Sequence, residues 1–175
     1  MGLRIKKQIE ILMKSNKSFK IFLIIWTALF VIVIGTLALH DYQRMKRSSD
    51  TKVIGVEIFN QINQVRKEQG LPILKYNRLL SRAGQDHCED MIKYDYFDHD
   101  REGRNMVDFV SELGISGGVG ENIARDINEP KEIVNRWMES ESHKEIMLGD
   151  FKEVGVGICK QDGGDLLVSS YYIKK

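Results

Sequence analysis

The pattern of hydrophobic and polar positions divides the chain into an N-terminal apolar run and a longer amphipathic region. Residues 21–39 read IFLIIWTALFVIVIGTLAL, nineteen residues without a charge. A helix needs about 20 apolar residues to cross a membrane, so the run predicts a transmembrane anchor. The alternative is a cleaved signal peptide, whose apolar region is about 7–15 residues and ends at a small-residue cleavage site. The poor match of residues 36–38 (TLA) to such a site and the long polar leader favour an uncleaved anchor.

The charges that flank this run predict its orientation. The leader, residues 1–20, carries six Lys or Arg residues and one Glu, and residues 40–52 carry four Lys or Arg and two Asp. Lys and Arg favour the cytoplasmic side, and their excess precedes the run. We therefore expect a cytoplasmic basic leader, an anchor at 21–39, a juxtamembrane spacer at 40–52 and an extracytoplasmic domain at 53–175.

The predicted domain is acidic, and this narrows its partners. Residues 53–175 hold 16 Lys or Arg and 22 Asp or Glu, a net charge of −6. Such a domain repels phosphate backbones, so no nucleic-acid partner is expected. The basic leader suits anionic lipid of the inner leaflet. Two cysteines, Cys88 and Cys159, are too few for a disulfide-built scaffold.

Within the domain, the apolar residues recur first with a helical period and later with a strand period. The helices expected are one through Ile58, Ile62 and Val65 that stops at Gly70, one from Asn77 with the stripe Leu79/Leu80, Ala83, His87 and Met91, a short one from Met106 to Leu113 that stops at Gly114, and one opening at Asn128-Glu129-Pro130. Residues 116–120 are expected to form a glycine loop. Ser142 and Glu145 fit a capping box, which predicts another short helix from His143.

The end of the chain predicts an antiparallel hairpin. Val154, Val156 and Ile158 alternate with smaller residues, residues 165–173 are strand-like, and Gln161-Asp162-Gly163-Gly164 is a turn signal between them. Helices first and a hairpin last indicate an α+β domain in which helices cover a sheet.

Three residues could hold a divalent ion. His99, Glu121 and His143 offer two imidazoles and a carboxylate, which suit an ion such as zinc. They are 22 residues apart in each gap, unlike a compact H-E-x-x-H helix, so spacing alone does not bring them together. The alternatives are a surface-loop histidine, a loop carboxylate and a helix-start histidine.

Other catalytic patterns are weaker. His87 and Cys88 are adjacent, but neighbouring helix positions point about 100° apart, so the ring cannot easily take the thiol proton. The position of His87 on an apolar stripe indicates a core or cleft-wall residue. Ser140 and Ser142 lack a G-x-S-x-G elbow.

Taken together, several segments resemble a known protein family. They are FNQINQVRKEQGLPILKYNRLLSRAGQDHCEDM, YFDHDREG, GENIA (Gly120–Ala124), WMESESH (Trp137–His143), EVGVGICK and SSYYI. Each is weak singly, but GENIA followed by W-x-x-S-x-x-H, after an F-x-H, is specific. From Phe59 to Tyr172 the chain resembles the CAP superfamily, the SCP-like domains of cysteine-rich secretory, antigen 5 and pathogenesis-related proteins, and is nearest to its bacterial branch.

The resemblance implies an α-β-α sandwich and a cleft with two histidines and acidic residues, which binds a divalent cation in several relatives. The two histidines fall on His99 and His143, and the first acid falls on Glu121. The second acid falls on Ser140, so that place is not matched, although acidic neighbours could substitute. The cleft residues expected are therefore His99, Glu121, His143, Ser140, Glu141 and, as a further neighbour, Glu139.

Three functions are compatible with these residues. The favoured one is a non-enzymatic binding module that presents its cleft to a lipid, peptide or cell-wall component. The alternative is a metal-dependent hydrolase, with an ion on His99 and His143 and Glu121 as general base. The third is a tethered signalling or adhesion domain with a vestigial cleft. Cys88 and Cys159 are expected to be buried near neighbours, with a disulfide between them left open.

Overall fold

The computed structural model describes residues 5–7, 10, 17–161 and 164–174. The chain divides into two compact units, Met1–Ser48 and Ser49–Lys175, and each is described by itself. Most of the predicted leader, and Asp162 and Gly163 of the predicted turn, lie outside the described residues.

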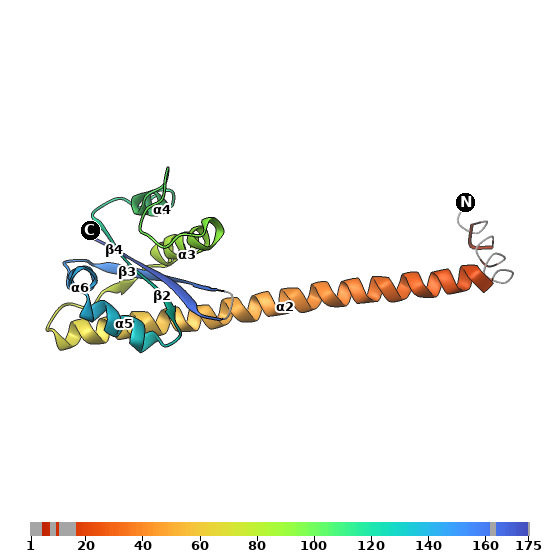
Figure 1. The fold of residues 1–175 in the computed structure, drawn as a ribbon, viewed down its shortest axis with the longest axis horizontal. Helices are drawn as coiled ribbons and strands as arrows, with labels where there is room; N and C mark the ends of the chain where they lie inside the picture. The colour runs from red at the N-terminus through yellow and green to blue at the C-terminus, as the bar shows by residue number, and fades with distance from the viewer. Residues whose placement is uncertain (1–4, 8–9, 11–16, 162–163, 175) are drawn as a thin grey trace. The chain divides into compact units, whose positions relative to one another are not determined.

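The N-terminal unit consists mainly of the first part of helix α2 (Lys17–Glu68) (Figure 1). This helix contains the apolar run, whose side chains are exposed, and it is long and apolar enough to cross a membrane. The spacer expected at 40–52 is helical as well, so α2 continues to Glu68. It stops before Gly70, whose φ of 70° is easily adopted only by glycine.

The C-terminal unit is built on a four-stranded sheet of order β1-β3-β4-β2. Its strands are β1 (Lys75–Tyr76), β2 (Val119–Ile127), β3 (Glu153–Lys160) and β4 (Leu166–Ile173). β1 pairs with β3 in parallel, and the other pairs are antiparallel. The predicted hairpin is confirmed as β3 and β4, with the Gln161 backbone N–H donating to the Asp165 carbonyl at 2.8 Å.

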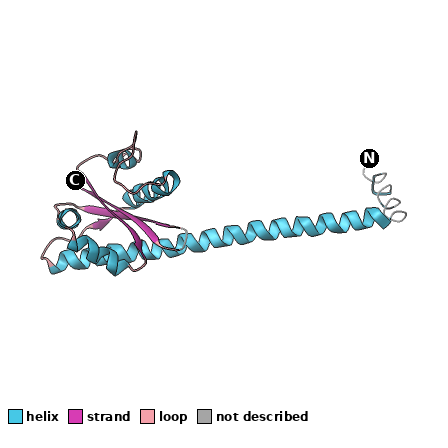
Figure 2. Cartoon of the chain, in the orientation of Figure 1, coloured by secondary structure: helices cyan, strands magenta, loops and turns pink. Residues whose placement is uncertain are grey.

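Helices cover both faces of this sheet (Figure 2). One face carries α3 (Arg78–Tyr94) and α4 (Met106–Ser111), and the other carries α5 (Pro130–Glu139), α6 (Glu141–Leu148) and the last turns of α2. β4 serves both sides because its side chains alternate: Val168 and Tyr172 pack with α2 and α5, whereas Tyr171 and Ile173 pack with α3 and α4. The expected α-β-α sandwich is confirmed.

Helix α3 lies directly on the backbone of β3. A Cβ atom on Gly157 would clash with the backbone of Gln85, and one on Gly155 would clash with that of Ser81. The side chains of these two α3 residues also accept hydrogen bonds from β3 backbone amides. Ser81 Oγ accepts from the Val156 N–H at 3.1 Å, and Gln85 Oε1 accepts from the Ile158 N–H at 3.2 Å. The alternation of glycine with apolar residues in β3 therefore serves a close helix–strand contact.

The predicted starts of three helices are confirmed. The Asn77 side chain caps α3 by accepting from the amides of Leu79 and Leu80. Helix α4 begins after Asn105, which forms a capping box with Asp108, and Pro130 occupies the first turn of α5.

Two local predictions are wrong. Strand β2 begins at Val119, so Val119 and Gly120 lie on a strand and the glycine loop is shorter than the predicted 116–120. Glu121, expected directly after that loop, lies on the same strand. Helix α6 begins at Glu141 after the N-cap residue Ser140, so the capping box expected from Ser142 does not form. The Ser142 hydroxyl lies 3.3 Å from that of Ser140 instead.

Candidate functional site

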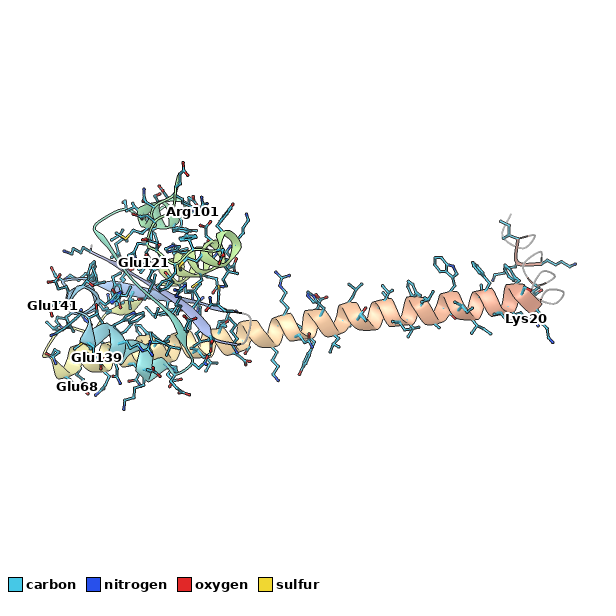
Figure 3. All side chains as sticks on the ribbon, viewed as in Figure 1. Lys20, Glu68, Arg101, Glu121, Glu139 and Glu141 are labelled. Atoms are coloured by element: carbon cyan, nitrogen blue, oxygen red, sulfur yellow. The ribbon has the colours of Figure 1, made fainter. Side chains whose placement is uncertain are left out.

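The site is centred on the carboxylate of Glu121, which β2 places beneath α3. Glu121 is 4% exposed. Its Oε1 lies 2.6 Å from His87 Nδ1, and its Oε2 lies 2.8 Å from His99 Nδ1. Ser169 of β4 also donates its hydroxyl to Oε1 at 2.6 Å. Figure 3 shows Glu121 inside the domain, with Glu139 and Glu141 away from it near α5 and α6.

These donors hold the carboxylate in its ionised form. Burial alone would raise the pKa of Glu121, but the hydrogen bonds from His87 and His99 outweigh it, and the pKa lies below its usual range. In turn, the hydrogen bond to Glu121 raises the pKa of His99, against the opposing effect of burial. The site is therefore a buried anion between two imidazoles.

His87 is the site residue that sequence reasoning missed as functional. It is 0% exposed, its ring stacks on Phe109 at 4.4 Å between centroids, and the Tyr171 hydroxyl lies 3.1 Å from its Nδ1. Because Glu121 is ionised, Nδ1 must donate to it, so in neutral His87 the proton sits on Nδ1. Its Nε2 is buried and has no hydrogen-bond partner among the described residues. The available signal was an imidazole on an otherwise apolar helix face.

His99 forms the open end of this chain of hydrogen bonds. Its side chain is 40% exposed, and its Nδ1 is bonded to Glu121. When His99 is neutral with its proton on Nδ1, the Nε2 atom carries a lone pair that can accept a ligand. The geometry is that of a carboxylate–histidine pair, in which the carboxylate sets the tautomer and orientation of the imidazole.

His143 comes from α6 and is half-buried. Burial lowers its pKa, and the charge of nearby His99 lowers it further. Its backbone carbonyl accepts from the Asn122 side chain at 2.9 Å, which ties the start of α6 to the strand residue beside Glu121. The structure thus joins His99 to Glu121 by a hydrogen bond, whereas His143 is linked to them only by the electrostatic effect of His99 on its pKa.

The other predicted cleft residues lie at the start of α6. Ser140 is its N-cap and Glu141 is an exposed residue of its first turn. Among the described residues, neither is hydrogen-bonded to Glu121. Neither therefore supplies a second acid to the buried cluster.

The arrangement of His99, Glu121 and His143 tests whether these side chains can hold the expected cation. In residues 17–161 and 164–174, no group of three or more His, Cys, Asp or Glu side chains is arranged to hold a metal ion. Both oxygens of Glu121 are already hydrogen-bonded, so its position fits an outer carboxylate better than a direct ligand. His99 and His143 are the donors that would hold an ion, and the cation site stays a prediction.

The two cysteines are neighbours in the apolar cluster between α3 and the sheet. Both are buried free thiols, and Cys88 donates to the Leu167 carbonyl at 3.2 Å. Burial raises the pKa of the Cys88 thiol well above its usual value, and the adjacent Cys159 adds to this. Since His87 bonds Glu121 and not Cys88, the pair does not form a thiol–imidazole dyad.

The fold agrees with comparisons to known proteins. The sequence pattern of the CAP (cysteine-rich secretory protein) family matches residues 59–172. This match covers more than half of the chain, and the protein therefore belongs to the CAP family.

Its relatives include two proteins of Bacillus subtilis (strain 168). The uncharacterized protein YkwD is 38% identical over 98 residues, which cover 54% of this chain and 38% of YkwD. The uncharacterized membrane protein YlbC is 30% identical over 115 residues, which cover 60% of this chain and 31% of YlbC. The chain thus spans less than two fifths of the length of these relatives.

A solved structure supports the fold. An extracellular protein containing an SCP domain from Bacillus anthracis superimposes with a TM-score of 0.69. It is 24% identical, and the match covers 74% of this chain and 43% of that protein. At this identity the likeness establishes the fold alone.

Proposed function

We propose that this CAP-domain protein is a membrane-anchored binding module, whose domain outside the membrane presents a cleft at His99 and His143. The observation that carries the proposal is the buried Glu121 carboxylate, which holds the Nδ1 of His99, a side chain that is itself 40% exposed. Such an imidazole is preorganised to accept one ligand at one atom. The ligand classes that fit a domain outside the membrane are a lipid, a peptide or a cell-wall component.

A divalent cation is the first ligand to test at this site. Two neutral imidazoles suit zinc, and His99 and His143 lie close enough for the charge of one to lower the pKa of the other. When bound, the ion would supply a Lewis acid beside the cleft. With no second acid in the buried cluster, we expect weaker binding than at a structural zinc site with four ligands.

The geometry favours binding over hydrolysis. A general base must reach the proton that it abstracts. Glu121, the carboxylate hydrogen-bonded to His99, is 4% exposed and has both oxygens engaged. Turnover of lipid esters or peptides that is lost in His143→Ala would instead support a metal-dependent hydrolase.

The test is zinc titration by calorimetry of the full chain in lipid nanodiscs. We expect saturable binding that is lost in His99→Ala and in His143→Ala. His40→Ala is the matched control, because His40 lies on α2 outside the domain and is exposed. Equal binding in all of these proteins would place zinc elsewhere and overturn the metal assignment.

The membrane anchor has its own test. The apolar helix and the basic leader support a cytoplasmic N-terminus and an external domain. Protease added to intact cells is expected to remove the domain and to spare the leader. A domain that is protected until the cells are lysed would reverse the proposed orientation.

A further inference from the structure

The loop that carries His99, residues 96–105, joins the end of α3 to the start of α4. All of its residues are described, and they form neither a helix nor a strand. Within this His99 loop the backbone amides of Arg101 and Arg104 donate to each other's carbonyls, at 2.9 and 3.0 Å. Because a loop has no ladder of backbone hydrogen bonds to fix its shape, its position depends on side-chain contacts to the elements beside it.

The main anchor of the His99 loop is the carboxylate of Asp90, near the end of α3. Asp90 is 7% exposed and accepts hydrogen bonds from three side chains of the loop. The Tyr96 hydroxyl donates to Oδ2 at 2.8 Å. Arg101, labelled in Figure 3, donates its Nε to Oδ2 at 2.6 Å and its Nη2 to Oδ1 at 3.2 Å. Arg104 donates its Nη1 to Oδ1 at 3.3 Å.

These donors compensate the buried charge of Asp90. Burial alone would raise the pKa of Asp90, but the hydrogen bonds from Arg101 and Tyr96 outweigh it, and the pKa lies below its usual range. The two-point pairing of the Arg101 guanidinium with the carboxylate fixes orientation as well as distance. A buried carboxylate that loses such partners is left uncompensated, which costs free energy. The contacts therefore favour a loop that is closed on α3.

Two of the anchors flank His99 closely. Tyr96 is three residues before it, and Arg101 is two residues after it. Since one residue spans at most about 3.6 Å, the backbone of His99 stays within about 7 Å of that of Arg101. The His99 side chain is 40% exposed, so packing alone holds it weakly, yet its Nδ1 lies 2.8 Å from Glu121 Oε2. The closed loop is what delivers the imidazole to that carboxylate.

His87 provides an internal comparison, because it bonds the other oxygen of Glu121 without belonging to the loop. It lies on α3, is fully buried, and its Nδ1 is 2.6 Å from Glu121 Oε1. Opening of the His99 loop would break the bond from His99 and leave the bond from His87 in place. A general loss of structure would break both bonds.

We propose that Asp90 is a positioning residue for the binding site, which holds the His99 loop closed and so keeps the Nδ1 of His99 on Glu121. The effect on ligand binding rests on the proposed function, whereas the effect on His99 itself does not. If removal of the Asp90 charge leaves the loop closed for only about one-tenth of the time, the apparent affinity of a ligand at His99 falls about tenfold.

The test is ¹⁵N NMR of the full chain in nanodiscs, with labelled histidine and no metal, at about pH 9, above the ordinary histidine pKa of about 6.5. In the native chain His99 and His87 are both expected as the Nδ1–H tautomer, because Glu121 accepts from both. The chain has four histidines, so each signal is assigned from a chain that lacks that residue. In Asp90→Asn we expect His99 to lose its preference for the Nδ1–H form and His87 to keep it.

A matched control separates this effect from the loss of any ion pair on α3. Asp86→Asn is the same substitution on the same helix, where Asp86 pairs with Arg82 at 2.8 Å. We expect it to leave both tautomers unchanged. An unchanged His99 in folded Asp90→Asn, or an equal change in Asp86→Asn, would overturn the proposal, and so would a parallel change at His87.

Tyr96→Phe keeps the proposal testable if Asp90→Asn does not fold. This variant retains the ring and removes one of the donors to Asp90. We expect His99 to shift in the same direction as in Asp90→Asn, by a smaller amount. A native His99 tautomer in this variant, in the absence of folded Asp90→Asn, would overturn the proposal.

Zinc calorimetry on the same chains distinguishes the role of Asp90 from the metal assignment. We expect zinc affinity to fall about tenfold in Asp90→Asn and to stay unchanged in Asp86→Asn. A native chain that binds no zinc, together with a changed His99 tautomer in Asp90→Asn, would refute the metal assignment and support the role of Asp90. Zinc binding at His99 that is equally tight in Asp90→Asn would overturn that role.

Discussion

Replacing His87 by leucine tests whether the buried histidine holds the Glu121 carboxylate. His87 is fully buried, and its Nδ1 donates to Glu121 Oε1 at 2.6 Å. Leucine occupies much of the imidazole volume, so the substitution removes the donor while leaving a small cavity. Glu121 keeps its bonds from His99 and Ser169.

The expected loss in the free energy of unfolding follows from these contacts. A hydrogen bond to a charged group contributes about 1.5–3 kcal/mol, and removal of one partner of a buried ion pair costs about 3–5 kcal/mol. Because two donors are retained, we expect a loss of about 3 kcal/mol for His87→Leu. His87→Asn restores an N–H near the position of Nδ1, so it is expected to recover about half of that loss.

The assay is urea unfolding of the full chain in nanodiscs, followed by the fluorescence of Trp137. This residue is 1% exposed and donates its indole N–H to the Ile123 carbonyl at 3.1 Å, so it reports on the domain. A Trp26→Phe background removes the signal of the apolar helix. A loss below about 1 kcal/mol for His87→Leu, or equal losses for Leu and Asn, would show that His87 acts only by packing.

Three further predictions concern the fold, the pH dependence and the thiols. Gly157→Ala is expected to unfold or strongly destabilise the domain, because α3 leaves no room for a Cβ atom; circular dichroism would show it, and a native-like melting temperature would contradict it. The pKa of His99 is raised in the folded protein, so its contribution to stability is complete below about pH 6.5 and is lost as the pH rises through the folded pKa. The pKa of Glu121 is lowered, so its contribution is complete above about pH 4.3 and is lost as the pH falls through the folded pKa. The stability advantage of the native chain over His99→Gln is therefore expected to peak between about pH 4.5 and 6.5, and an advantage that grows above pH 8 would refute the pairing. Cys88 and Cys159 are expected to resist alkylation in the folded protein and to react after unfolding, because burial keeps the Cys88 thiol protonated; rapid labelling of the folded protein would show that they are exposed.

Local patterns in the sequence predicted most of the secondary structure. Asn77 and Pro130 marked helix starts because capping and the first helical turn depend on a few neighbouring residues. The hairpin of β3 and β4 followed from alternation and from the turn signal in the sequence of residues 161–164. Strand β2 was missed because its residues, from Val119 to Ile127, mix charged and apolar side chains without a clear period, and pairing with β4 supplies what the local pattern lacks.

The candidate site was predictable only in part. The resemblance to the CAP superfamily pointed to His99, Glu121 and His143, and in the structure His99 and Glu121 are hydrogen-bonded to each other. The resemblance did not reveal that His87 is hydrogen-bonded to the same carboxylate, because the position of His87 on an apolar helix stripe is equally typical of a core residue. Ser140 and Glu141 were expected in the cleft from their place in a motif, yet they begin a helix at some remove from the buried anion.

The sequence by itself determined the apolar N-terminal helix, the class of the domain and its acidic charge, since these depend on composition and on short periodic patterns. Only the tertiary structure decided which side chains share the Glu121 carboxylate. His87, His99 and Ser169 come from a helix, a loop and a strand that are far apart in the chain. Their proximity is set by the packing of α3 on the sheet and by the order of the strands, and no local pattern encodes either of these.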